Sequence, residues 1–120
     1  MSAVSQSTLR VEREPQPVNV TFHDTVIAST TEALRLYEGN REPVLYIPRE
    51  HVEMAYFDES DKRTTCPLKG EARYWSISAG GYGETDAVWS YDDPKPAARD
   101  IAGYLAFYPD KVRIVVGQGK

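Results

Sequence analysis

Short segments in which apolar and polar residues alternate make up most of the chain, and this pattern constrains its fold most. Residues 18–22 and 25–28 alternate on either side of a His-Asp turn. A period of two is typical of strands with one buried face. The strand-helix alternation of a doubly wound α/β fold is absent, so the pattern predicts a mainly β, antiparallel domain built as a small open barrel or folded sheet. Further strand-like segments are 34–37, 44–47, 54–57, 73–79, 86–91 and 112–116.

One segment near the C-terminus follows a helical period instead. Pro94 and Pro96 precede it, and proline suits a first helical position. Apolar residues then recur at 98, 101, 102 and 105, which predicts one short helix. The polar stretch 58–70 is predicted to be a long loop. The glycine-rich stretch 80–85 is predicted to connect a hairpin formed by 73–79 and 86–91.

The 120 residues are enough for one domain. Residues 1–17 are rich in Ser, Gln, Glu and Pro and show no sustained apolar period. They are predicted to be a disordered tail that folding does not require. A single β domain is expected over 18–116, followed by a short tail at 117–120.

Charge and cysteine content exclude several classes of function. The net charge is −4, and between 58 and 73 four cations are interleaved with four acids, which argues against nucleic-acid binding. The single cysteine excludes an internal disulfide and a four-cysteine zinc site. The two histidines lie far apart, so neither a metal nor a cofactor is expected. No apolar run of membrane-spanning length occurs, and we expect a cytoplasmic protein; the oligomeric state is open.

The predicted hairpin places aromatic rings on one face. In a symmetric register Tyr74 opposes Tyr91 and Ser76 opposes Trp89, so Tyr74, Trp89 and Tyr91 share a face. Such rings either stack on a flat ligand, cage a cation or fill a small core. A slip of one residue would exchange the two faces. The opposite face, predicted to be core, carries Trp75, Ile77 and Val88.

Cys66 is a candidate reactive thiol. It precedes Pro67 and stands among cations that lower a thiol pKa. Neither His23 nor His51 has a spacing that indicates a catalytic dyad, and a lone cysteine also serves as a small buried apolar group. The predicted ligand-binding residues are Arg49, Arg63, Cys66, Lys69, Tyr74, Trp89, Tyr91 and Tyr104.

Ordered motifs over 46–52, 64–75, 87–94 and 101–108 resemble a widespread bacterial family of domains of unknown function. The family is catalogued with a nucleotidyltransferase-like label, and the resemblance covers about residues 18–116. The glycine-serine and paired-aspartate pattern of nucleotidyltransferases is absent from this chain. The residues that carry the resemblance are Thr64, Cys66-Pro67, Lys69-Gly70, Ala72 and Tyr74-Trp75, then Ala87, Trp89, Tyr91 and Pro94, then 101–108, with Tyr46, Pro48-Arg49 and Val52 upstream.

The resemblance implies a β-tent, in which two antiparallel sheets meet at an angle. Zinc-type methionine sulfoxide reductases and the cereblon ligand-binding domain share this fold. Relatives often hold zinc through paired Cys-x-x-Cys motifs, which this chain lacks, so the resemblance does not imply zinc. An aromatic cage serves as the ligand site in some relatives, in agreement with Tyr74, Trp89 and Tyr91.

Three functions remain open from the sequence. The first is a domain that binds a small, anionic or flat ligand in a pocket where Trp89 meets the 62–70 segment, with Trp75 more deeply buried. The second is a thiol-dependent enzyme that uses Cys66 at the same place. The third is a protein-interaction module whose aromatic residues form an exposed patch.

Overall fold

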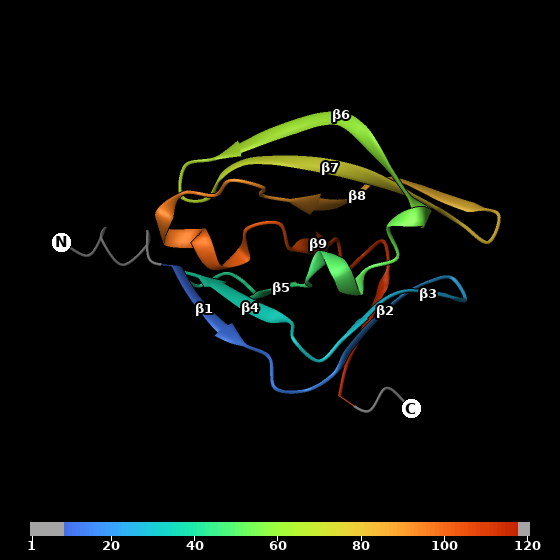
Figure 1. Ribbon diagram of the computed structural model, residues 1–120, viewed down its shortest axis with the longest axis horizontal. Coiled ribbons are helices and arrows are strands. Elements are labelled where there is room, and N and C mark those ends of the chain that lie inside the picture. The colour runs from blue at the N-terminus through green and yellow to red at the C-terminus, as the bar shows by residue number, and fades with distance from the viewer. Residues whose placement is uncertain (1–8, 118–120) are drawn as a thin grey trace.

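The computed structural model describes residues 9–117, which form three antiparallel sheets (Figure 1). The first sheet has the order β1–β4–β5 (Leu9–Arg13, Leu34–Glu38, Val44–Tyr46). The second has the order β10–β2–β3 (Arg113–Val116, Val18–Phe22, Thr25–Thr30). The third has the order β6–β7–β8–β9 (Phe57–Cys66, Gly70–Ala79, Tyr82–Ser90, Leu105–Phe107). Short 3-10 helices lie at Arg49–His51 (η2), Met54–Tyr56 (η3) and Pro96–Ile101 (η4).

The predicted mainly β, antiparallel fold is confirmed, but the strands are divided among three sheets instead of two. Ile47 and Leu105 exchange two backbone hydrogen bonds of 2.8 Å each, which join β5 to β9. The first and third sheets therefore form one continuous surface in the order β1–β4–β5–β9–β8–β7–β6. Within the described residues β1 and β6 do not pair, so this surface curls without closing into a barrel.

Two hydrophobic cores lie on opposite faces of the curled surface. The outer core fills the space against β2 and β3, and includes Val20, Ile27 and Trp75. The inner core lies inside the curl and includes Leu36, Tyr46 and Tyr74. Because successive strand residues point to opposite faces, neighbours in sequence enter different cores. The pairs divided in this way are Tyr46 and Ile47, Tyr74 and Trp75, and Leu105 and Ala106.

Both neighbours of β7 carry bulges opposite its centre. The register with β6 shifts between Glu59 and Arg63, and the register with β8 shifts between Trp75 and Ile77. Asp86, in the bulged part of β8, has a φ of 50°. Bulges bend a strand and increase its twist. The buried side of β7 changes at this bend, from Ala72 and Tyr74 to Trp75, Ile77 and Ala79.

Three predicted segments differ in the structure. Residues 57–66 form β6 instead of a loop; this edge strand is exposed on both sides over most of its length, so its sequence lacks apolar alternation. Residues 54–56 form η3 instead of a strand. The predicted 80–85 connection is only a two-residue turn, because Gly80 and Gly81 have φ values of 60° and 85° and β8 begins at Tyr82.

The predicted C-terminal helix is present as a short 3-10 helix. η4 ends at Ile101, and the φ of −118° at Ala98 interrupts it. Ala98 and Ile101 are fully buried. Because they are three residues apart, they lie on the same side of a 3-10 helix, which has three residues per turn. Leu105, which the helical pattern included, begins β9 instead.

The predicted tail is wrong for residues 9–17, whereas residues 1–8 and 118–120 lie outside the described part. β1 pairs with β4 along its whole length, from Leu9 opposite Glu38 to Arg13 opposite Leu34. Gly117 also belongs to the domain, since its N–H donates to the Pro17 carbonyl at 2.8 Å. The sequence hides β1 because it is an edge strand with only two apolar residues.

Glu14 fixes the chain where β1 ends. Its side chain is only 6% exposed, and one carboxylate oxygen accepts a hydrogen bond of 3.0 Å from Arg35 Nε on β4. Its backbone N–H donates to the Ala33 carbonyl at 2.9 Å. The Arg35 guanidinium and the Gln16 N–H together lower the pKa of the Glu14 carboxyl despite its burial.

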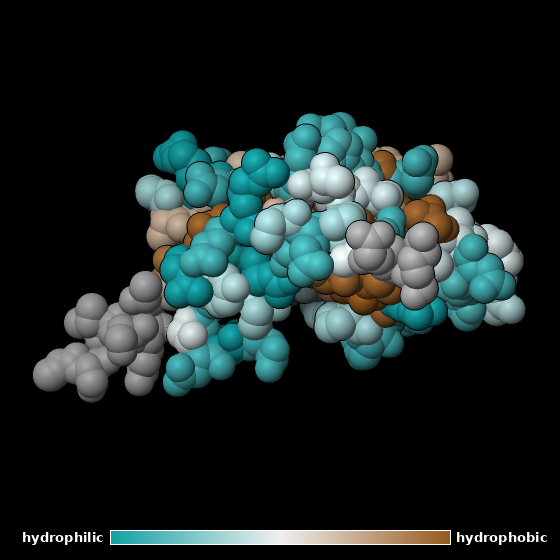
Figure 2. Space-filling view, turned by 90° about the horizontal axis from the view of Figure 1, so that it is seen from below, coloured by the Kyte–Doolittle hydropathy of each residue, from teal (hydrophilic) through white to brown (hydrophobic). Residues whose placement is uncertain are grey.

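Hydrophilic side chains cover most of the face seen from below, with hydrophobic atoms beside the C-terminal end (Figure 2). The large hydrophobic residues exposed among the described ones are Val26, Tyr82 and Val116. Across residues 9–117, no helix has the length and hydrophobicity that crossing a membrane requires.

Glu14→Gln should lower the free energy of unfolding by about 1 kcal/mol at pH 7, since a charge-assisted hydrogen bond is lost. Because the folded-state pKa of Glu14 is lowered, its stabilisation is fully present above the ordinary pKa of 4.5 and is lost as the pH falls through the folded value. Denaturant melts from pH 7 to pH 3 should show a weaker pH dependence in Glu14→Gln than in the wild type.

The matched control is Glu12→Gln, which removes a carboxylate on the same strand that is 52% exposed and pairs with Arg10. This variant should keep the wild-type pH dependence. Equal behaviour of the two variants would show that the Glu14–Arg35 pair does not stabilise the fold.

Candidate functional site

A cavity of about 210 Å³ opens on the inner face of the curled surface, where the first and third sheets meet. We call it the aromatic pocket. Strands β4 and β5 form one wall, β7 and β8 form the other, and the β4–β5 and β6–β7 turns contribute charged side chains. Its lining consists of Leu36, Glu38, Arg41, Glu42, Val44, Tyr46, Lys69, Tyr74, Trp89, Tyr91 and Tyr108.

Trp89 connects the two walls of the aromatic pocket. Its indole Nε1–H donates to the Tyr46 hydroxyl at 3.3 Å, and the two rings meet edge to face with centroids 6.5 Å apart. On its other side the Trp89 ring lies 4.5 Å from the Tyr108 ring at 46°. Edge-to-face and tilted contacts of this kind fix ring positions, so the aromatic wall is held in place without a ligand.

The tyrosine hydroxyls supply the polar groups of the aromatic pocket. Burial raises the pKa of Tyr46 and of Tyr91. Burial, together with a hydrogen bond to Tyr74, raises the pKa of Tyr108 to about 12. The Tyr74 hydroxyl lies 2.9 Å from Thr64 Oγ1 on β6. The raised pKa values keep Tyr46, Tyr91 and Tyr108 neutral near pH 7 and able to donate hydrogen bonds.

Lys69 and Glu38 form an ion pair at one end of the aromatic pocket. Lys69 Nζ lies 2.7 Å from Glu38 Oε1, and the side chains are only 10% and 17% exposed. The Lys69 carbonyl accepts a hydrogen bond of 2.9 Å from the Lys95 N–H, which holds the β6–β7 turn. The next residue, Gly70, has a φ of 114°, a conformation that favours glycine.

The hairpin register differs from the prediction by two residues. Tyr74 pairs with Trp89 and Trp75 with Val88, because the turn is short and the β8 bulge intervenes. A shift of two keeps Tyr74, Trp75, Val88 and Trp89 on their predicted faces. Trp75, 4% exposed, lies in the outer core, whereas Trp89 is partly exposed beside the inner core. The predicted difference in burial between the two tryptophans is thus confirmed.

Four of the eight predicted site residues come together in the aromatic pocket: Lys69, Tyr74, Trp89 and Tyr91. Cys66 is partly buried and packs against the inner core without lining the cavity. Tyr104 borders a separate hollow with Leu34. The other two, Arg49 and Arg63, belong to a different cluster.

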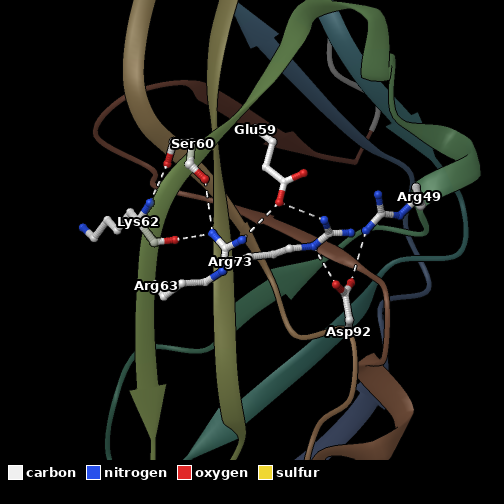
Figure 3. Close-up of polar contacts among 7 residues, drawn as sticks. All are labelled: Arg49, Glu59, Ser60, Lys62, Arg63, Arg73 and Asp92. Atoms are coloured by element: carbon white, nitrogen blue, oxygen red, sulfur yellow. Dashed lines mark hydrogen bonds and ion pairs between the residues drawn. The ribbon is translucent and has the colours of Figure 1, made fainter.

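That cluster surrounds the Arg73 side chain of β7 (Figure 3). Asp92 pairs with Arg49 at 3.4 Å and with Arg73 at 2.5 Å. Both guanidinium groups lie over the Trp75 ring, 5.2 and 4.8 Å from its centroid. Arg49 therefore covers the outer core instead of lining the aromatic pocket. Glu59 joins the cluster through ion pairs with Arg63 and Arg73.

Seven lining residues were not predicted from the sequence: Leu36, Glu38, Arg41, Glu42, Val44, Tyr46 and Tyr108. Tyr46 and Tyr108 lie within the motifs that carry the family resemblance, and that resemblance is the signal from which they could have been identified. Glu38, Arg41 and Glu42 surround an ordinary Gly-Asn turn, and nothing in their pattern indicates a site.

Cys66 occupies the end of β6, where the chain turns into β7. Burial opposes ionisation, but the Leu68 and Lys69 N–H groups and the Lys69 ammonium lower the pKa of the thiol overall. The histidines lie elsewhere: His23 stacks on Tyr82 with centroids 3.6 Å apart, and His51 Nδ1 lies 2.7 Å from Thr30 Oγ1. Across residues 9–117, no group of three or more His, Cys, Asp or Glu side chains is placed to hold a metal.

Residues 10–118 match the sequence model of a family described as "Domain of unknown function (DUF427)" and labelled NTP_transf_9. The chain belongs to this family. The match starts within β1 and continues beyond β10, so the family domain includes the strand that the sequence analysis placed in a tail. No curated protein matches the chain.

Trp75→Ala should cost roughly 3–5 kcal/mol of unfolding free energy, as expected for truncation of a large core residue. Trp89→Ala should cost less, because part of its ring already contacts solvent. Denaturant melts of the two variants measure the difference directly. A larger loss for Trp89→Ala would contradict the division of β7 and β8 side chains between the two cores.

Cys66 should react with iodoacetamide with an apparent pKa below the ordinary value of 9.0. Lys69→Met should raise this apparent pKa, because it removes the ammonium next to the thiol. Lys95→Met is the matched control, since Lys95 Nζ donates to the Pro67 carbonyl in the same turn at 2.8 Å. Mass spectrometry of labelling rates from pH 6 to pH 10 would decide, and an equal shift in both variants would refute the role of Lys69.

Proposed function

We propose that this protein binds a small planar molecule in the aromatic pocket. One observation carries the proposal: Trp89 and four tyrosines from separate segments surround a single cavity of about 210 Å³. Small-molecule sites are concave, mostly apolar and equipped with a few converging polar groups. The aromatic pocket has this composition, with ring faces as walls and hydroxyl groups and one ion pair as polar groups.

The size of the cavity limits the ligand. Sites for drug-sized molecules are commonly about 300–1,000 Å³, and the aromatic pocket is smaller at about 210 Å³. A single ring or a fused pair of rings fits this space. Flat rings also gain most from aromatic walls, because stacked and edge-to-face contacts are available on several sides.

The two other functions receive less support. A thiol enzyme needs a base next to its nucleophile, and both histidines contact residues far from Cys66. An interaction module needs exposed aromatic residues, yet Tyr74 and Tyr91 are only 5% and 6% exposed. Cys66 is a free thiol, and we place the protein in a reducing compartment such as the cytoplasm as part of the proposal.

A screen of one- and two-ring planar fragments by ligand-observed NMR tests the proposal. Several fragments should bind the wild type and lose at least about tenfold in affinity with Trp89→Ala, which removes a wall of the pocket. Tyr82→Ala is the matched control, because Tyr82 is an exposed aromatic residue at the tip of the same hairpin. It should leave the fragment affinities unchanged.

Two results would refute the proposed function. One is a screen in which no planar fragment binds the folded wild-type protein. The other is fragment binding that Tyr82→Ala weakens and Trp89→Ala leaves intact. Circular dichroism of both variants establishes that a loss of binding is not a loss of fold.

A further inference from the structure

We infer that the ligand is electrically neutral and carries a carbonyl group on its planar ring, which accepts hydrogen bonds from the pocket tyrosines. The inference rests on the proposed function and names the class of ligand for the same site. Two properties of the aromatic pocket lead to it: its balanced charge and its hydroxyl donors.

The charged groups of the aromatic pocket balance in number, and two of them form an ion pair. Lys69 is held by Glu38 at 2.7 Å, with both side chains mostly buried. At the β4–β5 turn, Arg41 and Glu42 contribute one charge of each sign. The ionic lining therefore sums to zero before any ligand enters, so the pocket offers no net charge to attract a charged ligand.

A cation would meet a further obstacle. Aromatic walls attract cations over their faces, but Lys69 Nζ already lies 5.9 Å from the centroid of the Tyr91 ring. The protein thus supplies its own ammonium group to this cage. An anion would approach Lys69 only beside the Glu38 carboxylate, which repels it.

The tyrosine hydroxyl groups favour a ligand that carries a hydrogen-bond acceptor. The Tyr46 hydroxyl accepts a hydrogen bond from Trp89 Nε1, which leaves its own proton free to donate. Tyr91, a residue that is 6% exposed, also lines the cavity, and its hydroxyl is a second donor at the cavity wall. Burial keeps both phenols protonated by raising their pKa. Two neutral donors that line one small cavity favour a ligand with an acceptor oxygen.

A carbonyl on an aromatic or heteroaromatic ring satisfies all of these groups. Its flat body contacts the rings of Trp89 and Tyr108, and its oxygen receives the phenol protons. A neutral carbonyl also loses far less hydration energy on entering the pocket than a carboxylate or an amidinium does. The Glu38 carboxylate remains available to an N–H beside the carbonyl, as in a primary amide or a ring lactam.

Benzamide, benzoate and benzamidine form a matched set of probes, because they share size and shape and differ in charge. Binding is measured at pH 7 from the indole N–H signal of Trp89 in two-dimensional NMR, assigned with Trp89→Phe. Benzamide should bind at least about tenfold more tightly than benzoate and benzamidine. Equal or tighter binding of either charged probe would overturn the inference.

Tyr91→Phe tests the hydroxyl directly. This change should weaken benzamide binding roughly three- to tenfold, the value of one neutral hydrogen bond, and should leave toluene, the same ring without a carbonyl, unaffected. Tyr82→Phe, a hydroxyl deletion on an exposed tyrosine, should change neither probe. Loss of toluene binding with Tyr91→Phe, or unchanged benzamide binding, would contradict the role of the hydroxyl.

The outcomes separate the inference from the proposed function. If planar fragments bind but benzoate or benzamidine is preferred, the pocket is a ligand site of another class and only the inference fails. If fragments bind and none of the three probes does, the inference also fails alone. If neither the fragments nor the probes bind, both fail together.

Discussion

The paired bulges beside β7 are the constraint on which the rest of the structure depends. Extra residues in β6 and β8 lie opposite the same short stretch of β7, around Tyr74 and Trp75. A sheet bent there from both sides can bury one face at one end and the opposite face at the other. Tyr74 and Trp75 are consecutive buried residues for this reason, and each begins a different core.

The bend also explains why a pocket exists. The third sheet curls toward β4 and β5, and the Ile47–Leu105 bridge joins their backbones, so a space remains between the two walls. Aromatic rings line this space, and burial raises the pKa of Tyr46, Tyr91 and Tyr108, so these hydroxyls stay neutral. The pair of Lys69 and Glu38 connects the β6–β7 turn to β4, which fixes the distance between the walls.

The strands that could be predicted from the sequence differ in burial from those that could not. Alternation identified β2, β3, β4 and the buried half of β7, because each has one face in a core. It failed for β1 and β6, since edge strands gain backbone pairing without burying a regular face. The aromatic face was predicted correctly despite a register error of two residues, because side-chain direction repeats every two residues. A shift of one would have exchanged Trp75 and Trp89.

The sequence by itself determined the antiparallel β class and the family, because these follow from the local order of the residues. Only the tertiary structure decided which residues surround the pocket. Tyr46 and Glu38 line it from the first sheet. Arg49, which was predicted to line it, lies over the Trp75 ring instead. The physical reason is that contacts between sheets depend on bulges and on the single bridge between β5 and β9, and neither leaves a periodic signal in the chain.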